Sequence, residues 1–596
     1  MGIRVAAKRT LDSLPLRPGR LTQYLSCDTT NADSEQFSRI SRPVHEDYVH
    51  VNPEVAPEPE LLSVSNDAVI DLELDPDETQ TDQFVQVFSG NTLLHDTRPW
   101  SLCYGGHQFS LWANQLGDGR AISLFETKTK QGECWDIQLK GAGRTPFSRF
   151  GDGYAVLRSS IREYLCSEHM HALGVPTTRA LALITTSREV YREPEAETDA
   201  VGPEHGAVVA RMAPSWLRFG SFELPYARNN MKAVQRLADY CADQVYGPEA
   251  LECLDASAAP ANENKYTRLF LQVAKRTAIM VARWQAVGFN HGVMNTDNFS
   301  ILGLTLDYGP FQFMDFYEPA YICNHSDTAG QYAFKRQPTV CVYNLFKFGV
   351  PLFELIGAGN KVDEIVYVDP READEATKAT ATDDVTRQAY REAGKEYVTK
   401  VLSEDFTDWF MEELQQVMQN KLGLLKSDAS TMADVIIPLL DWATEFKVDH
   451  HRLFRSMSKY EVTSKGEDHD NALALSTLDI IPKDPARLDD AKQALAPWLS
   501  IYRHLLLDQD AAQENKARQL RMNANNPRFV LRNWIVQQVI DAFDKQPQDE
   551  AKKTLNACLY ACTHPYQEHY NDPQIEAWIN ASVPEWGQDL KCSCSS

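Results

Sequence analysis

The sequence has few basic residues for its length and no cysteine spacing typical of a metal site. Its 59 lysines and arginines stand against 83 aspartates and glutamates, which gives a formal net charge of -24. Because a phosphate backbone is bound by a basic surface, this balance argues against a nucleic-acid polymer as the partner. A basic pocket for one nucleotide remains compatible with it. The 12 cysteines are scattered along the chain, which suits reduced and individually buried thiols.

The sequence also has no apolar run that approaches the roughly 20 residues needed to span a bilayer, so no membrane span is expected. The N-terminal segment from Met1 to Leu21 carries several basic side chains and a single acidic one, Asp12. This bias is typical of an organelle transit peptide, and it also fits a basic, loosely ordered terminus.

The order of residue patterns along the chain predicts an α+β fold in four parts. These are an extended segment that wraps a core (1–84), a part with short strands and one helix (85–225), a helical part (226–450) and a helical extension with a polar tail (451–596). Strands followed by helices are the order expected of a protein-kinase-like, two-lobed fold. Surface loops are predicted at Arg188–Gly206 and Asp369–Asp384.

The strongest motif is HGVMNTDNFSILGLTLDYG, which runs from His291 to Gly309. Protein kinases carry H-R-D-x-x-x-x-N followed by D-F-G, and the Asn and the second Asp hold the metal ions that contact ATP. In this chain Asn298 falls at the Asn and Asp307 begins D-Y-G. Amide and carboxylate oxygens are the ligands that Mg²⁺ or Mn²⁺ prefers. The intervening residues, Phe299–Leu306, predict a short hairpin.

The position of the kinase catalytic Asp holds no carboxylate in this motif. Val293 stands there, and its side chain can neither accept nor orient a proton. The nearby carboxylate is Asp297, directly before the Asn of the motif. An ordinary Asx-rich loop and hairpin is the alternative interpretation, but His, Asn and D-Y-G together favour a nucleotide site.

A strand lysine and a helix glutamate precede this motif. Cys134–Lys140 alternates apolar and polar residues, so it predicts a strand with Lys140 on the face opposite the apolar side chains. Ala155–Leu173 predicts a helix, and Glu163 lies off its apolar stripe. The position of Glu163 also fits a solvated side chain. The order of Gly-rich turn, Lys, Glu and metal loop favours a Lys140–Glu163 pair, as in kinases.

Two Gly-rich segments can approach phosphate groups. Gly117-Asp118-Gly119, followed by Arg120, can form a tight turn whose N–H groups face a phosphate, although a plain hairpin turn fits the same residues. The segment Gly141–Gly153 adds Arg144 and Arg149 and suits another phosphate grip. Arg211 and Arg218 suit phosphate oxygens as well, and as isolated residues they would also fit structural ion pairs.

Four long segments resemble the selenoprotein O family of pseudokinase-fold protein adenylyltransferases. They are GGHQFSLWANQLGDGRA (Gly105–Ala121), LKGAGRTPFSRFGDGYAVLRSSIREYL (Leu139–Leu165), HGVMNTDNFSILGLTLDYGPFQFMD (His291–Asp315) and CNHSDTAGQYAF (Cys323–Phe334). The likeness runs from about residue 60 to the C-terminus. It implies that ATP binds inverted relative to a kinase, so that AMP passes to a Ser, Thr or Tyr hydroxyl of a protein substrate.

The resemblance also implies roles for individual residues. Those that would hold the nucleotide are Gly117, Asp118, Gly119, Arg120, Lys140, Asp152, Gly153, Arg211, Arg218 and Asp307. Glu163 would orient Lys140. Asn298 and Asp307 would bind Mg²⁺ or Mn²⁺, and Asp297 would accept the proton. Because such transfers depend mainly on positioning and charge neutralisation, a weak base is tolerable.

The C-terminal tail and the location of the protein are interpreted through the same family. Many members carry selenocysteine third from the end, where this chain has Cys594, with Cys592 two residues earlier. A C-x-C pair can form a strained, easily reduced disulfide, which implies a redox function, whereas two idle thiols are the alternative. Eukaryotic members are mitochondrial, so a mitochondrial location is predicted.

Three functions remain open at this point. The first is adenylyl transfer to proteins, and the second is an atypical phosphotransferase that uses Asp297 as its base. The third is a non-catalytic nucleotide-binding scaffold or thiol redox sensor. The third is favoured if Asp307→Ala and Lys140→Met preserve the cellular phenotype while Cys594→Ser abolishes it.

Overall fold

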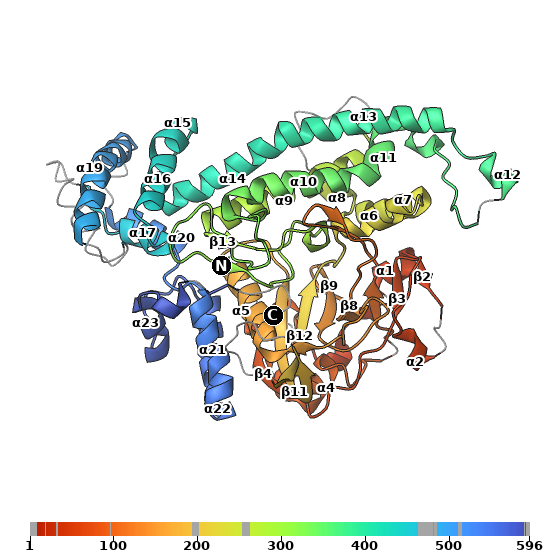
Figure 1. The fold of residues 1–596 in the computed structure, drawn as a ribbon, viewed down its shortest axis with the longest axis horizontal. Helices are drawn as coiled ribbons and strands as arrows, with labels where there is room; N and C mark the ends of the chain where they lie inside the picture. The colour runs from red at the N-terminus through yellow and green to blue at the C-terminus, as the bar shows by residue number, and fades with distance from the viewer. Residues whose placement is uncertain are drawn as a thin grey trace.

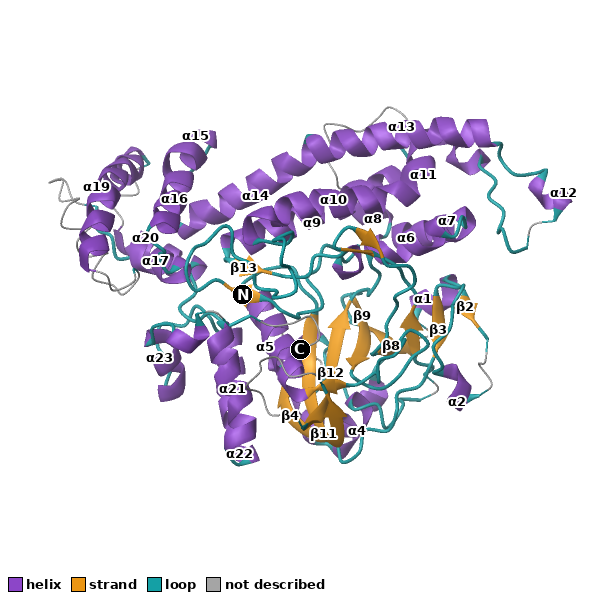
Figure 2. Cartoon of the chain, viewed as in Figure 1, coloured by secondary structure: helices purple, strands orange, loops and turns teal. Residues whose placement is uncertain are grey.

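A broad β-sheet lies beneath a layer of long helices, and a further group of helices follows at one end of the molecule (Figure 1; Figure 2). The computed structural model describes residues 9–17, 19–30, 34–95, 97–192, 202–252, 263–372, 374–462, 481, 485–509, 515–588 and 590–591. The fold is therefore mixed α+β, with most strands in the first part of the chain and most helices after it.

Ten strands form the main sheet, in the order β2-β3-β5-β8-β9-β12-β11-β4, with β1 paired to β8 and β10 to β12. Among the strand pairs of the described residues, β2–β3 is parallel and the others are antiparallel. Two small ribbons, β6–β7 and β13–β14, lie outside this sheet. The strands are β1 (Leu16–Arg17), β2 (Cys27–Asp28), β3 (Tyr48–His50), β4 (Glu60–Val64), β5 (Trp100–Leu102), β6 (His107–Gln108), β7 (Leu111–Trp112), β8 (Ala121–Lys128), β9 (Cys134–Lys140), β10 (Ala155–Val156), β11 (Arg179–Tyr191), β12 (Pro203–Ala213), β13 (Phe289–Asn290) and β14 (Gln312–Phe313).

The helices cover the sheet and then continue away from it. The first group comprises α1 (Arg20–Tyr24), α2 (Glu35–Ser38), α3 (Asn66–Asp71), α4 (Asp82–Phe88), α5 (Leu157–Ala172), α6 (Phe219–Ala227), α7 (Met231–Tyr240), α8 (Pro248–Glu252), α9 (Lys265–Ala286), α10 (Gln337–Gly349) and α11 (Phe353–Gly357). The second comprises α12 (Glu375–Lys378), α13 (Asp384–Ser403), α14 (Asp405–Lys421), α15 (Ala429–Thr431), α16 (Ile437–Glu445), α17 (His450–Met457), α19 (Pro485–Asp508), α20 (Asn515–Asn525), α21 (Asn533–Lys545), α22 (Gln548–Thr563) and α23 (Pro573–Asn580).

The N-terminal segment is more structured than the extended chain expected over residues 1–84. Helices α3 and α4 pack beneath the sheet, and Val69 and Phe84 share a core with Ile122 of β8 and Ile137 of β9. Strand β4 pairs with β11 at the edge of the sheet. The four strands of this segment are only two to five residues long. Runs this short show no sequence periodicity, because they are defined by their partners in the sheet.

Three apolar cores hold the layers together. The first is the one beneath the sheet. The second joins the other face of the sheet, through α5, to α9, α10, α21 and α22. The third lies among the later helices, mainly between Met418 and Met522, and therefore crosses the boundary that sequence analysis places at residue 450.

Several local predictions differ from the structure. Strands β11 and β12 extend into the predicted loop Arg188–Gly206. No hairpin forms over Phe299–Leu306, where Ser300 and Thr305 make single bridges to Arg218 and Thr177 rather than to each other. These residues pair with distant segments, so the local sequence does not show their partners.

One helical stretch within the described residues, Phe334–Gly357, is long and apolar enough by length and composition to cross a membrane. Basic residues such as Lys335 and Lys347 interrupt it, so it does not stand out as an apolar run in the sequence. In the structure 61% of its apolar window is buried inside the protein, where it forms α10, α11 and the short turns beside them.

Candidate functional site

Lys140 and Glu163 form the first contact of the candidate site. Lys140 is the last residue of β9, and Glu163 lies in the second turn of α5, which crosses the same face of the sheet. Lys140 Nζ lies 2.6 Å from Glu163 Oε2. Burial opposes ionisation of Glu163, but Lys140 and Arg211 outweigh it and lower the pKa of this carboxyl. The pair fixes the lysine at the point where the strand ends.

Asp307 is the centre of the site, because three basic side chains converge on it. Its carboxylate lies 3.1 Å from Lys140 Nζ, 2.9 Å from Arg211 and 2.5 Å from Arg218. Burial opposes its ionisation, yet Arg218, Lys140 and Arg211 together hold the pKa of Asp307 well below its usual range. The sequence-predicted Lys, Asp and two Arg residues therefore lie in one cluster.

The two arginines are positioned by aromatic rings and buried polar groups. The guanidinium of Arg211, on β12, lies 4.5 Å from the ring centre of Trp216 and donates to Glu163 at 2.7 Å. Arg218 immediately precedes α6, lies 4.8 Å from the ring centre of Tyr104 and donates to the carbonyl of Asp297 at 2.8 Å. Both guanidiniums are buried, and the carboxylates that face them offset the free-energy cost of burying their charge.

The two Gly-rich segments pack against each other. Gly117 has a φ of +84°, and a Cβ there would lie 2.4 Å from the ring of Phe147. Thr145 donates to the carbonyl of Asp118 at 2.7 Å. Gly153 has a φ of +79°, and a Cβ there would lie 2.3 Å from the backbone of Gly143. Only glycine allows these approaches, which join the first turn to the second loop.

Other predicted nucleotide residues have different surroundings. Asp118 is buried, and it accepts a hydrogen bond from the backbone of Leu102 at 3.1 Å, so it supports the turn from within. Burial lowers the pKa of Arg120, although the charges of Glu163 and Asp307 oppose this effect. Asp152 forms an ion pair with Arg192 at 2.8 Å. Cys592 and Cys594 lie outside the described residues.

Asp297 and Asn298 lie in a short turn that Arg218 connects to Asp307. Asp297 is buried, and one of its carboxylate oxygens accepts from Gln108 at 3.2 Å while the other has no hydrogen-bond partner. Burial raises the pKa of Asp297 to about 6. Asn298 donates to the carbonyl of Val293 at 3.1 Å, which orients its amide.

The same residues offer part of a ligand set for a divalent cation. Among the described residues no group of three or more His, Cys, Asp and Glu side chains gathers as metal ligands. The amide oxygen of Asn298 and the carboxylate of Asp307 are hard donors of the kind that Mg²⁺ and Mn²⁺ accept. This incomplete set fits an ion that takes its remaining ligands from substrate phosphates and water.

Sequence reasoning assigned no role to three residues of the cluster. Gln138 accepts a hydrogen bond from Arg211. It lies two residues before Lys140 on β9, so the alternation of this strand places both side chains on the same face and could have indicated Gln138. Gln108 lies in Gly105–Ala121, one of the segments that resemble the family, but no role was predicted for it. Tyr104 lies beneath Arg218, and no local pattern predicts that contact.

The mixed fold and the buried cluster of cations around Asp307 are typical of an enzyme that handles nucleotide phosphates. The sequence model of the family described as protein adenylyltransferase SelO matches residues 33–559. The chain belongs to this family. The family and the class of enzyme expected from the motifs, a nucleotidyltransferase, are thereby confirmed.

Individual relatives agree over nearly the whole length of the chain. A Schizosaccharomyces pombe protein named "Protein adenylyltransferase SelO, mitochondrial" is 36% identical over 555 residues, which cover 92% of this chain and 91% of the relative. A Myxococcus xanthus protein named "Protein nucleotidyltransferase YdiU" is 37% identical over 92% of this chain and 95% of its own length. The Thioalkalivibrio sulfidiphilus protein of the same name is 39% identical, over 91% and 94% respectively.

Proposed function

We propose that this protein transfers AMP from ATP to Ser, Thr or Tyr hydroxyls of protein substrates. The observation that carries the proposal is the convergence of Lys140, Arg211 and Arg218 on Asp307. These cations are held in place before any nucleotide arrives, so they can neutralise its phosphates with little rearrangement. Family membership supports the adenylyl group, rather than a terminal phosphate, as the group transferred.

The residues of the cluster divide the work. Lys140, Arg120, Arg211 and Arg218 bind phosphate oxygens, and Glu163 orients Lys140. The glycines of the two loops let backbone N–H groups approach the nucleotide. Asn298 and Asp307 would hold Mg²⁺ or Mn²⁺, which when bound supplies charge neutralisation at the phosphates.

Asp297 is proposed as the proton acceptor. The acceptor hydroxyl oxygen forms a bond to the α-phosphorus of ATP, the bond between that phosphorus and the β-phosphate oxygen breaks, and pyrophosphate leaves. The hydroxyl proton passes to Asp297. Its unpartnered oxygen and its pKa of about 6 suit a base that takes one proton near neutral pH.

We further propose that the fold is protein-kinase-like and two-lobed. Residues 85–225 form the strand-rich lobe, the following helices form the second lobe, and residues 1–84 wrap the first. Residues 451–596 form the helical extension, and the third core, which lies mainly between Met418 and Met522, joins it to the helices before it. A mitochondrial location and a redox role for Cys592 and Cys594 belong to the same proposal. The name of the Schizosaccharomyces pombe relative supports the location.

The proposal is tested with two preparations of ATP, one radiolabelled at the α-phosphate and the other at the γ-phosphate. Label from the α-phosphate should become attached to protein, and label from the γ-phosphate should not. The opposite pattern would support the atypical phosphotransferase instead. Asp307→Asn serves as the control for labelling that does not need the site.

A further inference from the structure

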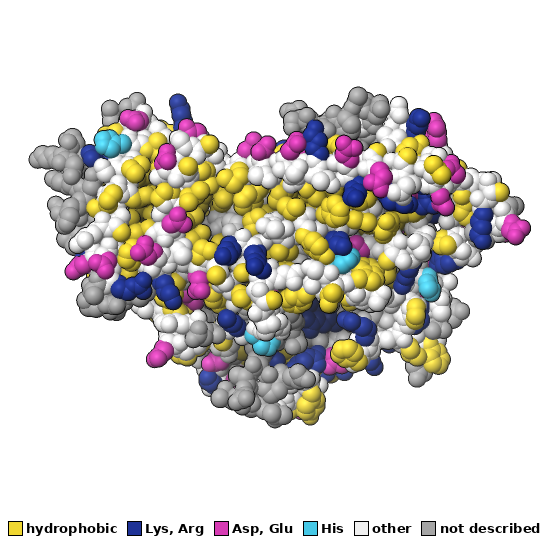
Figure 3. All heavy atoms as spheres, turned by 45° about the horizontal axis from the view of Figure 1, so that its top comes forward, with side chains coloured by type: hydrophobic (Ala, Val, Ile, Leu, Met, Phe, Trp, Pro, Cys, Tyr) yellow, Lys and Arg dark blue, Asp and Glu magenta, His cyan; other side chains and the backbone are white. Residues whose placement is uncertain are grey.

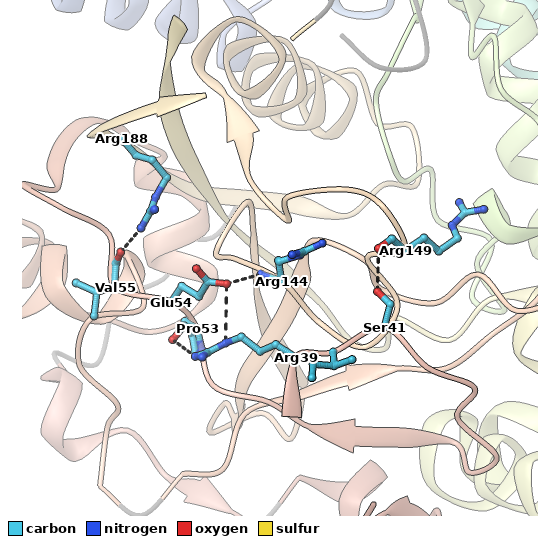
Figure 4. Close-up of a pocket in the computed structure, with 9 residues that line it drawn as sticks. Arg39, Ser41, Pro53, Glu54, Val55, Arg144, Arg149 and Arg188 are labelled. Carbon is cyan, nitrogen blue, oxygen red and sulfur yellow. Dashed lines mark hydrogen bonds and ion pairs between the residues drawn. The ribbon is translucent and has the colours of Figure 1, made fainter. Parts of the chain in front are cut away.

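A second basic site lies on the outer side of the second Gly-rich loop. It is a cavity of about 700 Å³ whose lining includes Arg39, Arg144, Arg149 and Arg188 and, among the described residues, one carboxylate, that of Glu54 (Figure 4). Figure 4 shows Arg188 and Arg149 toward opposite ends of it, with Glu54 between them. Three parts of the chain that are distant in sequence therefore bring four guanidiniums to one hollow.

The single carboxylate is already committed to neighbouring groups. Glu54 accepts from the backbone N–H of Arg144 at 3.0 Å and from the hydroxyl of Tyr154, and it lies 4.0 Å from Arg39. The described residues give no hydrogen bond or ion pair to the guanidinium of Arg144 or to that of Arg149. Within the part of the chain that the structure describes, the guanidiniums of Arg144 and Arg149 therefore bring uncompensated positive charge to the cavity, in a chain whose overall charge is -24.

Two of the arginines that line the cavity are held in position by contacts with neighbouring groups. Arg188 lies 4.2 Å from the ring centre of Tyr154 and donates to the carbonyl of Val55 at 2.6 Å. Arg39 donates to the carbonyl of Pro53 at 3.3 Å. Because Arg188 is held by a ring and a neutral carbonyl group, its charge remains available to an anion.

We propose that this cavity binds an acidic segment of the protein substrate, an inference that rests on the proposed function. Guanidinium groups pair with carboxylates in a two-pronged geometry, and several arginines along one hollow suit several carboxylates along one chain. A nucleotide fits the lining less well, since none of the described residues that line the cavity has an aromatic ring on which a base could stack. The exposed side chain of Val55, which lines the cavity, suits an apolar residue next to the acids.

The position of the cavity relates it to the nucleotide loops. Arg144 and Arg149 belong to the loop whose opposite face, through Phe147 and Ser148, packs on Gly117 and Gly119. A protein segment held here lies on the same lobe as the proposed nucleotide site. The cavity therefore contributes to the choice of substrate rather than to the chemistry of transfer.

The test is a direct binding measurement with a short, fluorescein-labelled oligoglutamate peptide and the full-length protein. By fluorescence anisotropy at low ionic strength, the double variant Arg144→Ala, Arg149→Ala should bind the peptide at least about tenfold more weakly than the wild type. The double variant Lys395→Ala, Lys400→Ala, which removes the same charge from exposed positions of α13, should bind it unchanged. The double variant Arg144→Lys, Arg149→Lys should give an intermediate affinity. Lysine keeps the positive charge but lacks the planar guanidinium that pairs with a carboxylate through two N–H groups.

Equal binding by the wild type and the alanine variant would overturn the proposal. So would binding of inorganic triphosphate at this site without binding of the peptide, because that result identifies a site for small anions. The peptide measurement contains no ATP. A failure of AMP transfer with intact, arginine-dependent peptide binding would therefore count against the proposed activity and leave the docking site standing.

Discussion

The charges around Asp307 show how single residues prepare the site. Asp307 and Glu163 hold Lys140 and Arg211 within ion-pair distance, and Arg218 is shared between Asp307 and Asp118. Such a network holds the basic groups in place when no nucleotide is bound. Phosphates that enter can then replace part of the carboxylate contacts.

Replacing Lys140 with methionine should therefore remove charge without removing bulk. We expect AMP transfer to fall by about two to three orders of magnitude, as when one preorganised group is lost from a site of developing charge. Initial rates with α-labelled ATP measure the effect. Lys128→Met, at an exposed position on the neighbouring strand β8, is the matched control and should retain full activity. Equal loss in both variants would contradict the role of Lys140.

Lys421 is a second residue whose environment makes a measurable prediction. It is buried in the third core, its ammonium lies 4.5 Å from the ring centre of Phe454, and burial lowers its pKa to about 7. In the unfolded chain its pKa is near 10.5. Between these two values the unfolded state binds more protons, so the stability of the wild type rises with pH across this window.

Lys421→Met should thus be more stable than the wild type near pH 6, by about 1–3 kcal/mol, with the advantage shrinking toward pH 9. Urea unfolding at the two pH values gives the difference. Lys426→Met, at an exposed position in the same region, should show no such pH dependence. An advantage that stays constant from low to high pH would show that Lys421 does not titrate in this range.

At the scale of elements, the contact between the two Gly-rich segments depends on two kinds of constraint. Gly153 has a positive φ and backbone atoms 2.3 Å from the point where a Cβ would lie, whereas Gly174 has a φ of +77° with open space around it. Gly174→Ala should cost about 1 kcal/mol of unfolding free energy, and Gly153→Ala about 1–3 kcal/mol more. Urea unfolding of the two variants separates backbone strain from the steric clash, and equal losses would contradict the close approach.

The elements also show what local sequence can and cannot predict. Strand β9 has the predicted bounds, and α5 (Leu157–Ala172) lies within the predicted helix Ala155–Leu173, because each carries a clear period of apolar residues. Helices α13 and α14, by contrast, are divided at Glu404. The apolar period continues through that break, so the pattern alone does not reveal it.

Sequence patterns predicted the cluster around Asp307 but not the outer arginine cavity. Lys140, Glu163 and Asp307 lie on elements with recognisable patterns, and the structure brings them together. The outer arginine cavity needs Arg39, Glu54 and Arg188, which approach only after the N-terminal segment has packed on the sheet. No spacing in the sequence encodes that assembly.

At the scale of the whole molecule, strand β4 of the N-terminal segment and the C-terminal helix α22 meet at the sheet. Ser63 of β4 donates to Asn556 of α22 at 2.8 Å, and Tyr164 of α5 donates to Ser63 at 3.1 Å. The N-terminal segment and the C-terminal helices therefore stabilise the strand-rich part from opposite ends of the sequence. Integrity of the site depends on both.

The protein is acidic overall, with a net charge of -24, yet basic side chains cluster around Asp307 and in the outer arginine cavity. Figure 3 shows acidic and basic side chains interspersed along the upper edge of one face, and several groups of basic side chains near and below its centre. An acidic exterior with concentrated basic hollows disfavours general binding to polyanions and favours binding at those hollows.

The central claim is that AMP is the group transferred, and tandem mass spectrometry of the modified protein tests it most directly. After incubation with unlabelled ATP and Mg²⁺ or Mn²⁺, we predict an AMP ester on a Ser, Thr or Tyr hydroxyl, which is absent with Lys140→Met. A phosphate ester on the same residues, with no AMP adduct, would contradict the claim.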